Sequence, residues 1–223
     1  MHIEPGVVDG AKIALSYATA AGAGATGLYL LGQTVKSCGL PATALRSAIA
    51  TAATFFFFQV LPHVPVGVSE VHLILGSSLF LILGAGPAAF GLAMGLLLQG
   101  LFFAPTDLPQ YGMNVTTLLV PLFGLGLLAR RIIAPGTAYT DLRYGQVLRL
   151  SFAYQGGVVA WVAFWAIYGQ GFGVISEVAS FGVAYLAVIL IEPLVDLGLL
   201  AAAKALRHRT PPALVTPRLH GAA

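Results

Sequence analysis

Long apolar segments separated by short polar connections limit most strongly how this chain can fold. A helix needs about 20 apolar residues to cross the hydrocarbon core of a bilayer. Several of the seven expected spans approach that requirement, and the alternation of an outer-membrane β-barrel is absent. Their approximate bounds are 11–35, 43–61, 72–83, 88–103, 115–128, 147–168 and 177–200. We therefore expect an all-α integral membrane protein, a bundle of about seven transmembrane helices.

Composition supports this class. Charged residues make up 9% of the 223 residues, whereas about a quarter are charged in a typical soluble domain. We expect one transmembrane helical domain over residues 1–206 and a polar tail over 207–223. Cys38 is the only cysteine, which excludes an internal disulfide and a cysteine-based metal cluster. Basic patches with interleaved aromatic residues are lacking, so no nucleic-acid partner is expected.

Positive residues predict how the bundle is oriented. In a seven-span layout only Lys12 falls on one side, and the other ten basic residues fall on the opposite side. Lysine and arginine concentrate on the cytoplasmic side of membrane proteins. We therefore expect the N-terminus outside and the C-terminal tail in the cytoplasm of a cell, with a bacterial inner membrane as the expected location. His2, His63 and His72 then share the outer face.

Alanines recur at four-residue spacing in the first two predicted helices. They are Ala14, Ala18, Ala44, Ala48 and Ala52. Small residues on one helix face let another helix approach closely. Two readings stay open: packing within this bundle, or docking of another membrane subunit.

Motifs for ATP hydrolysis and for intramembrane hydrolysis are missing. The chain has no GxxxxGK[ST], GxSxG or HExxH sequence, so we expect a transport component and not an enzyme. Glu192 and Asp196 lie one turn apart in the last segment and could relay protons. An ion pair with Lys204 or with an interfacial arginine is the simpler expectation.

The first two residues, Met1 and His2, can chelate a metal between them. A free α-amino group, the deprotonated amide of residue 2 and its imidazole offer three nitrogens to one divalent ion. A second imidazole would complete a planar four-nitrogen site, which suits Ni(II) or Cu(II). His72 is the candidate, because an imidazole where an apolar segment begins is costly without a partner. The simpler reading, two histidines without a metal, stays open from these residues alone.

Polar neighbours could support these ligands. Ser69, Gln99 and Asn114 are candidates for hydrogen bonds that orient the imidazoles, although helix capping or helix–helix bonding would also explain them. The role of Glu70, close to His72, is open. His63, between two prolines, is expected to be a solvated loop residue.

Three stretches resemble the CbiM/NikM family, the substrate-binding membrane components of energy-coupling-factor transporters for cobalt or nickel. The opening MHIEPG resembles the family's MHI-x-x-G start. VSEVHLILG at 68–76 and LLLQGLFFAPTDLPQYGMN at 96–114 continue the resemblance. The spacing in HLILG and the composition of TDLPQYGMN depart from the family pattern, which leaves the metal's identity open. The second half of the chain agrees in hydropathy and topology only.

The resemblance implies a bundle into which the N-terminus folds from outside. It implies that the Met1 amine, the His2 amide and imidazole, and the His72 imidazole hold Ni²⁺ or Co²⁺ as the transported substrate, with no covalent cofactor. It implies as partners a membrane coupling subunit, two ATP-binding cassette ATPases and a small accessory membrane protein. A self-sufficient secondary transporter or channel, with Glu192 and Asp196 as coupling groups, is one alternative. A non-transport membrane assembly or chaperone protein is the other.

Overall fold

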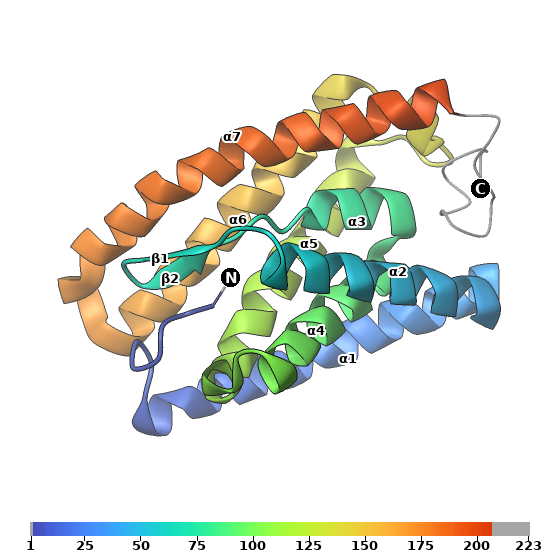
Figure 1. Cartoon of the computed structure of the whole chain (residues 1–223). Coiled ribbons are helices and arrows are strands. Elements are labelled where there is room, and N and C mark those ends of the chain that lie inside the picture. Colours follow the sequence, from blue (N-terminus) through green and yellow to red (C-terminus); the bar gives the residue numbers. More distant parts are fainter. Residues whose placement is uncertain (1, 207–223) are drawn as a thin grey trace.

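The computed structural model describes residues 2–206, most of which lie in helices. Figure 1 shows α1 and α7 on opposite sides of the molecule, with the N-terminal segment and a short hairpin between them. The α-helices are α1 (Ile13–Cys38), α2 (Leu40–Gln59), α3 (Gly76–Leu83), α4 (Ala85–Phe102), α5 (Tyr111–Ile132), α6 (Tyr144–Gln170) and α7 (Ile175–Ala205). Short 3₁₀ turns are η1 (Gly10–Lys12), η2 (Pro105–Gln110), η3 (Tyr139–Asp141) and η4 (Gly171–Val174).

Four helical stretches of the described chain are long and apolar enough to cross a membrane. They are Leu40–Gln59, Ala85–Phe102, Pro105–Ile132 and Tyr144–Ala205, and the last contains both α6 and α7. The expected class, an all-α membrane protein, is therefore confirmed. The count of seven transmembrane helices and the orientation of the termini stay predictions, as does the tail at 207–223, which lies outside the described residues.

The third predicted span, 72–83, is wrong in its first part. Only α3 is helical there, and its eight residues reach about 12 Å at 1.5 Å per residue, far less than the ~30 Å hydrocarbon core. The chain before α3 pairs as a strand and then passes through Leu75, whose φ of 53° is left-handed. Apolar composition alone did not reveal this interruption.

Two connections expected to be longer turns each consist of one glycine. Gly39 joins α1 to α2 and Gly84 joins α3 to α4, with φ angles of 82° and 97°. Pro41 and Pro87 follow within the first turns of their helices, where a missing N–H breaks no helical hydrogen bond.

Helix α4 packs closely on α2 because small residues line the contact. A Cβ added to Gly91 would lie 2.2 Å from the Cβ of Ala50, and one added to Gly95 would lie 2.6 Å from that of Thr54. Neither position has room for a side chain while the helices stay at this distance. This packing holds the ends of α2 and α4, with Phe58 and Gln99, beside the N-terminal segment.

The alanines at 14, 18, 44, 48 and 52 are all exposed on this chain. Helix α2 instead buries a different face, formed by Thr43, Arg46, Ser47, Ala50, Thr54 and Phe58. Packing within the bundle therefore does not explain the alanines, and that reading is wrong. Docking of another subunit stays a prediction.

The stretch 62–72, expected to be a loop or a broken entry to the third span, forms an antiparallel hairpin of β1 (Val64–Val66) and β2 (Ser69–Val71). The two-residue turn begins at Gly67, whose φ of 61° suits a tight hairpin turn. The N-terminal segment adds to this hairpin through an isolated bridge between Ile3 and Ser69.

Candidate metal centre

Strand β2 and the N-terminal segment bring the candidate ligands together. Side chains two residues apart in a strand point to the same side, which places Glu70 and His72 together. The carbonyl of His2 accepts hydrogen bonds from the Glu70 amide at 2.9 Å and from the Ser69 hydroxyl at 2.8 Å. Pairing of backbone atoms therefore sets the position of His2 against β2.

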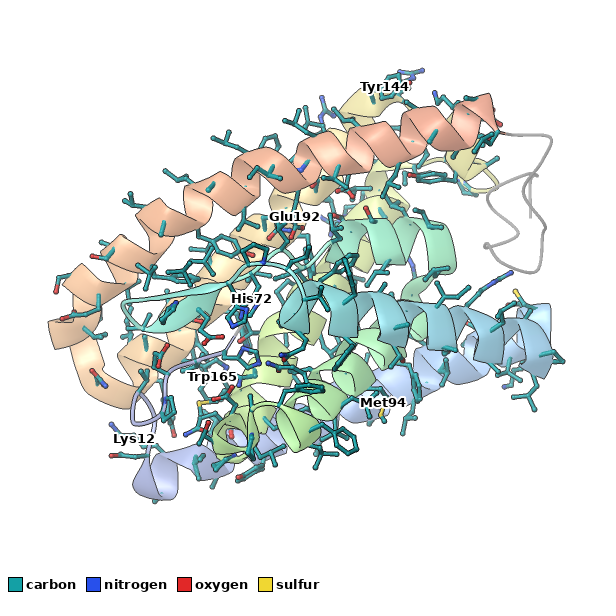
Figure 2. The ribbon with its side chains drawn as sticks, viewed as in Figure 1. Lys12, His72, Met94, Tyr144, Trp165 and Glu192 are labelled. Atoms are coloured by element: carbon teal, nitrogen blue, oxygen red, sulfur yellow. The ribbon has the colours of Figure 1, made fainter. Side chains whose placement is uncertain are left out.

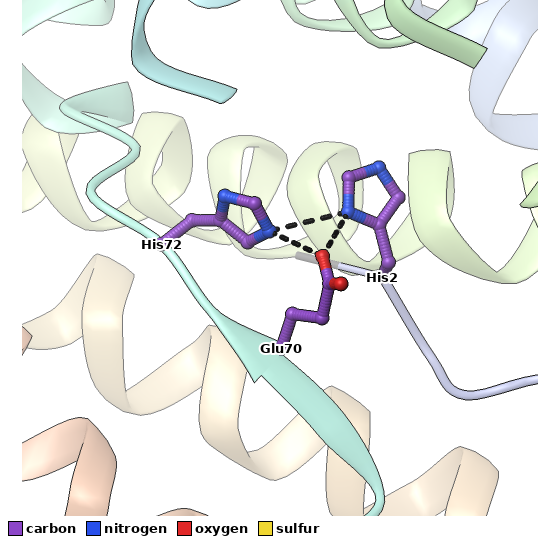
Figure 3. Close-up of side chains that lie close together, drawn as sticks. All are labelled: His2, Glu70 and His72. Atoms are coloured by element: carbon purple, nitrogen blue, oxygen red, sulfur yellow. Dashed lines mark hydrogen bonds and ion pairs between the residues drawn. The ribbon is translucent and has the colours of Figure 1, made fainter. Parts of the chain in front are cut away.

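Three possible ligand atoms converge in Figure 3, from His2, Glu70 and His72. Oε2 of Glu70 lies 2.8 Å from Nδ1 of His2 and 2.8 Å from Nε2 of His72. The two imidazole nitrogens are 3.2 Å apart. Ligands about 2.0–2.1 Å from one ion lie about 2.9 Å apart at right angles and about 3.4 Å apart in a tetrahedron. The observed spacings therefore suit ligands of one metal ion.

Gln99 controls which nitrogen of His2 carries a proton. Its Oε1 lies 2.7 Å from Nε2 of His2 and accepts that nitrogen's hydrogen. In a neutral imidazole the other nitrogen, Nδ1, then carries a lone pair. That lone pair faces the Glu70 carboxylate, an arrangement that a cation between them would stabilise. A bond that fixes the tautomer of a ligating histidine is typical of metal sites.

The site is shielded from water. His2 and His72 are 3% and 1% exposed, while the Glu70 side chain is 23% exposed and forms the accessible edge. Burial lowers the pKa of both imidazoles below the ordinary value of about 6.5. Both histidines are therefore neutral at pH 7, as metal ligands must be.

Aromatic rings cover His72 from two sides. Phe58 of α2 and His63 stack on its imidazole, each with a centroid separation of 4.8 Å. His63 is exposed, as expected, but it covers the site instead of standing apart from it. Nδ1 of His72 is buried and has no hydrogen-bond partner among the described residues, so the position of this ring depends on its neighbours and backbone.

All three residues that were expected to orient the ligands form hydrogen bonds with the N-terminal segment. Ser69 binds the His2 carbonyl, Gln99 binds its ring, and the Oδ1 atom of Asn114 accepts the Ile3 amide at 2.8 Å. Met1 lies outside the described residues. The sequence leaves the role of Glu70 open, and its period-two spacing to His72 is the available signal.

The buried acidic pair on α7 lies deeper and has different partners from those expected. Lys204 donates to the Leu142 carbonyl at 2.9 Å, so the expected ion pair with this lysine is wrong. Ser77 donates to Asp196 at 2.6 Å, and Glu192 accepts from the backbone amide of Ile74. Both carboxyl groups thus bind the segment that follows His72.

Comparisons with known proteins show the family and the fold of this chain. The CbiM family, described as "Cobalt uptake substrate-specific transmembrane region", matches residues 2–210. A Haemophilus influenzae protein named "Putative metal transport protein" is 38% identical over 143 residues, which cover 63% of each chain. A crystal structure described as a truncated transition metal transporter has a TM-score of 0.64 at 17% identity. Its alignment covers 94% of this chain and 100% of that one, which shows a shared fold.

Proposed function

Because the chain belongs to the CbiM family of cobalt-uptake substrate-specific transmembrane regions, we propose that it captures Ni²⁺ or Co²⁺ for uptake across a membrane. The convergence of His2 Nδ1, His72 Nε2 and Glu70 Oε2 carries this proposal. These atoms come from segments about 70 residues apart, and a shared cation explains why two neutral imidazoles and a carboxylate meet in a buried place.

The orientation of His2 also supports the chelate proposed from the sequence. A chelate that includes the residue's own amide nitrogen closes a six-membered ring through Nδ1, and Nδ1 is the atom turned toward His72. Among the described residues, the His2 amide donates no hydrogen bond, whereas the amides of Ile3 and Glu4 both do. We propose that this amide and the Met1 amine complete the nitrogen set. Four nitrogens in a plane would favour Ni²⁺ by geometry.

In this proposal Glu70 adds a negative charge at the accessible edge of the site. Its carboxylate offsets the charge of a divalent ion and offers an oxygen next to both imidazole nitrogens. Because it is the most exposed of the three groups, Glu70 is the one that an entering ion meets first.

Energy for uptake would come from other chains. We propose a membrane coupling subunit, two ATP-binding cassette ATPases and a small accessory membrane protein as partners, in the inner membrane of a bacterium. The exposed alanines of α1 and α2 are the proposed contact with a helical membrane subunit. The proposed topology keeps seven helices in the membrane, of which α3 is too short to cross it alone, and places the metal site on the outer side.

Equilibrium binding of Ni²⁺ and Co²⁺ to the purified full chain, with no residues added before Met1, tests the proposal. We expect one ion per chain and competition between the two metals. Uptake into proteoliposomes should then require the ATPases and ATP. Uptake by this chain alone would indicate a self-sufficient transporter, and absence of binding would refute metal capture.

A further inference from the structure

The segment 72–76 is held at more than one point. At one end, the His72 ring lies in the metal centre. Two residues later, the amide of Ile74 donates to Oε1 of Glu192 on α7, and both of these residues are fully buried. Figure 2 labels His72 and Glu192, and both lie in the interior of the bundle. Helix α7 therefore binds the backbone that carries a proposed ligand.

Glu192 is itself oriented by two further side chains. Gln155 of α6 donates to its Oε2, and the Tyr185 hydroxyl donates to Oε1 of Gln155 at 2.6 Å. All three side chains are fully buried. One carboxylate oxygen of Glu192 thus accepts from Gln155 of α6 and the other accepts from Ile74. The carboxyl group cannot rotate without losing a buried hydrogen bond.

The backbone of this segment needs such support. Leu75 is the only residue other than glycine with a positive φ among the described residues, and that conformation is disfavoured for leucine. A Cβ on Gly76 would lie 2.3 Å from Cζ of Tyr154, so Tyr154 of α6 packs directly against the end of the segment. A disfavoured backbone persists only where its surroundings impose it.

We propose that Glu192 is a positioning residue for the metal centre: by binding the Ile74 amide, it sets the direction of the His72 imidazole. The inference rests on the proposed function, because its effect is read as metal affinity. His72 has no hydrogen bond at Nδ1 to orient its ring, so its direction depends on the stacked rings of Phe58 and His63 and on the backbone that Glu192 holds. The secondary-transporter alternative gave Glu192 a coupling role, whereas these contacts give it a structural link to the ligand.

Exchanging the side chains of Glu192 and Gln155 tests the proposal. In Glu192→Gln, the new amide N–H group faces the N–H group of Gln155. Turning the Gln155 amide to accept from residue 192 leaves the Tyr185 hydroxyl proton without its acceptor, so either arrangement loses a buried hydrogen bond. In the double variant Glu192→Gln with Gln155→Glu, the carboxylate at 155 accepts from both Tyr185 and residue 192, and residue 192 still accepts from Ile74. All three hydrogen bonds are then restored with donor and acceptor exchanged between α6 and α7.

The probe is Ni²⁺ alone, titrated into the full chain in detergent. We expect Glu192→Gln to weaken binding about 10-fold or more, the size typical of groups that orient metal ligands, and the double variant to recover most of the loss. Glu177→Gln makes the same change at an exposed position on α7 and should bind as the wild type does. The melting temperature of each metal-free variant is measured in parallel.

Lower stability of Glu192→Gln with unchanged affinity overturns the proposal, because a purely structural role gives that result. Weakened binding that the double variant fails to recover also overturns it. If Glu192→Gln does not fold, Tyr185→Phe removes one hydroxyl and keeps the ring; intermediate loss of affinity supports the proposal, and wild-type affinity overturns it. Failure of the wild type to bind either Ni²⁺ or Co²⁺ refutes the proposed function itself, and the inference falls with it.

Discussion

The Nδ1 atom of His2 lies 3.2 Å from the Nε2 atom of His72, although 70 positions separate the two residues in the chain. The two imidazoles can meet only because the segments that carry them pack against each other. The bridge between Ile3 and Ser69 brings the N-terminal segment to β2, and β2 leads directly to His72. The proposed site therefore depends on the fold as a whole. The contribution of each of its residues can be tested separately.

His2→Ala and His72→Ala should each abolish tight Ni²⁺ binding. Each change removes a proposed ligand that no neighbouring nitrogen replaces, and groups behind the ligands alone typically account for 10–100-fold in affinity. We expect losses above about 100-fold in a direct titration. Circular dichroism should show unchanged helix content.

His63→Ala is the matched control for those variants. Its ring stacks on His72 but is exposed and offers no atom to the cluster, so the loss should be much smaller. If both site variants retain wild-type affinity, the metal binds elsewhere.

Glu70→Gln should weaken binding by about 10-fold or more while keeping the shape of the side chain. The substitution removes the negative charge that lies 2.8 Å from both imidazole nitrogens. Isothermal titration of the variant beside the wild type measures the change. Affinity equal to that of the wild type would show that Glu70 has a role only in the metal-free protein and does not contribute to metal binding.

Residues added before Met1 should eliminate binding, whereas additions at the other end should not. An extension converts the proposed ligating amine into an amide and leaves His2 inside an ordinary chain. Metal content of N-terminally and C-terminally tagged proteins, compared side by side, measures this effect. Exact proteolytic removal of the N-terminal tag should restore binding, and deleting residues 210–223 should preserve it. Equal binding by the extended protein would rule out the amine as a ligand.

Lower pH should weaken both metal binding and the metal-free fold. Burial lowers the pKa of His2 and His72, so the folded protein takes up protons less readily than the unfolded chain. The associated stability is present above about pH 6.5 and is lost as the pH falls from there through the lowered pKa values. Protons also compete with the metal for the same nitrogens. Melting temperatures at pH 7.5 and 5.5 should differ less in a variant lacking both histidines.

Much of the helical framework was predictable from hydropathy, but its interruptions were not. The sixth predicted span, 147–168, lies within α6, because a long apolar stretch allows little other than a helix. The prolines near His63 favoured a loop, and no local sequence pattern predicted that β1 and β2 would pair. The left-handed Leu75 is imposed by surrounding contacts, which composition cannot reveal.

Prediction of the site had a similar limit. His2 and His72 could be chosen by the chemistry of imidazole, since histidine is rare in this chain. The role of Glu70 stayed open, because its period-two spacing to His72 is informative only in a strand, and no strand was expected there. Glu192 was noticed as a buried acid, but its partner is a backbone amide, and backbone partners leave no signature in a sequence.

The bond between the Ile3 amide and Asn114 spans 111 positions, and this separation has a consequence for biosynthesis. Ribosomes add about 5–20 residues per second, so roughly 6–22 s pass between the making of Ile3 and of Asn114. During that interval the first residues have left the ribosome and have no finished pocket to enter. The N-terminal segment, which carries the proposed ligand His2, thus gains this partner only after four α-helices have been made.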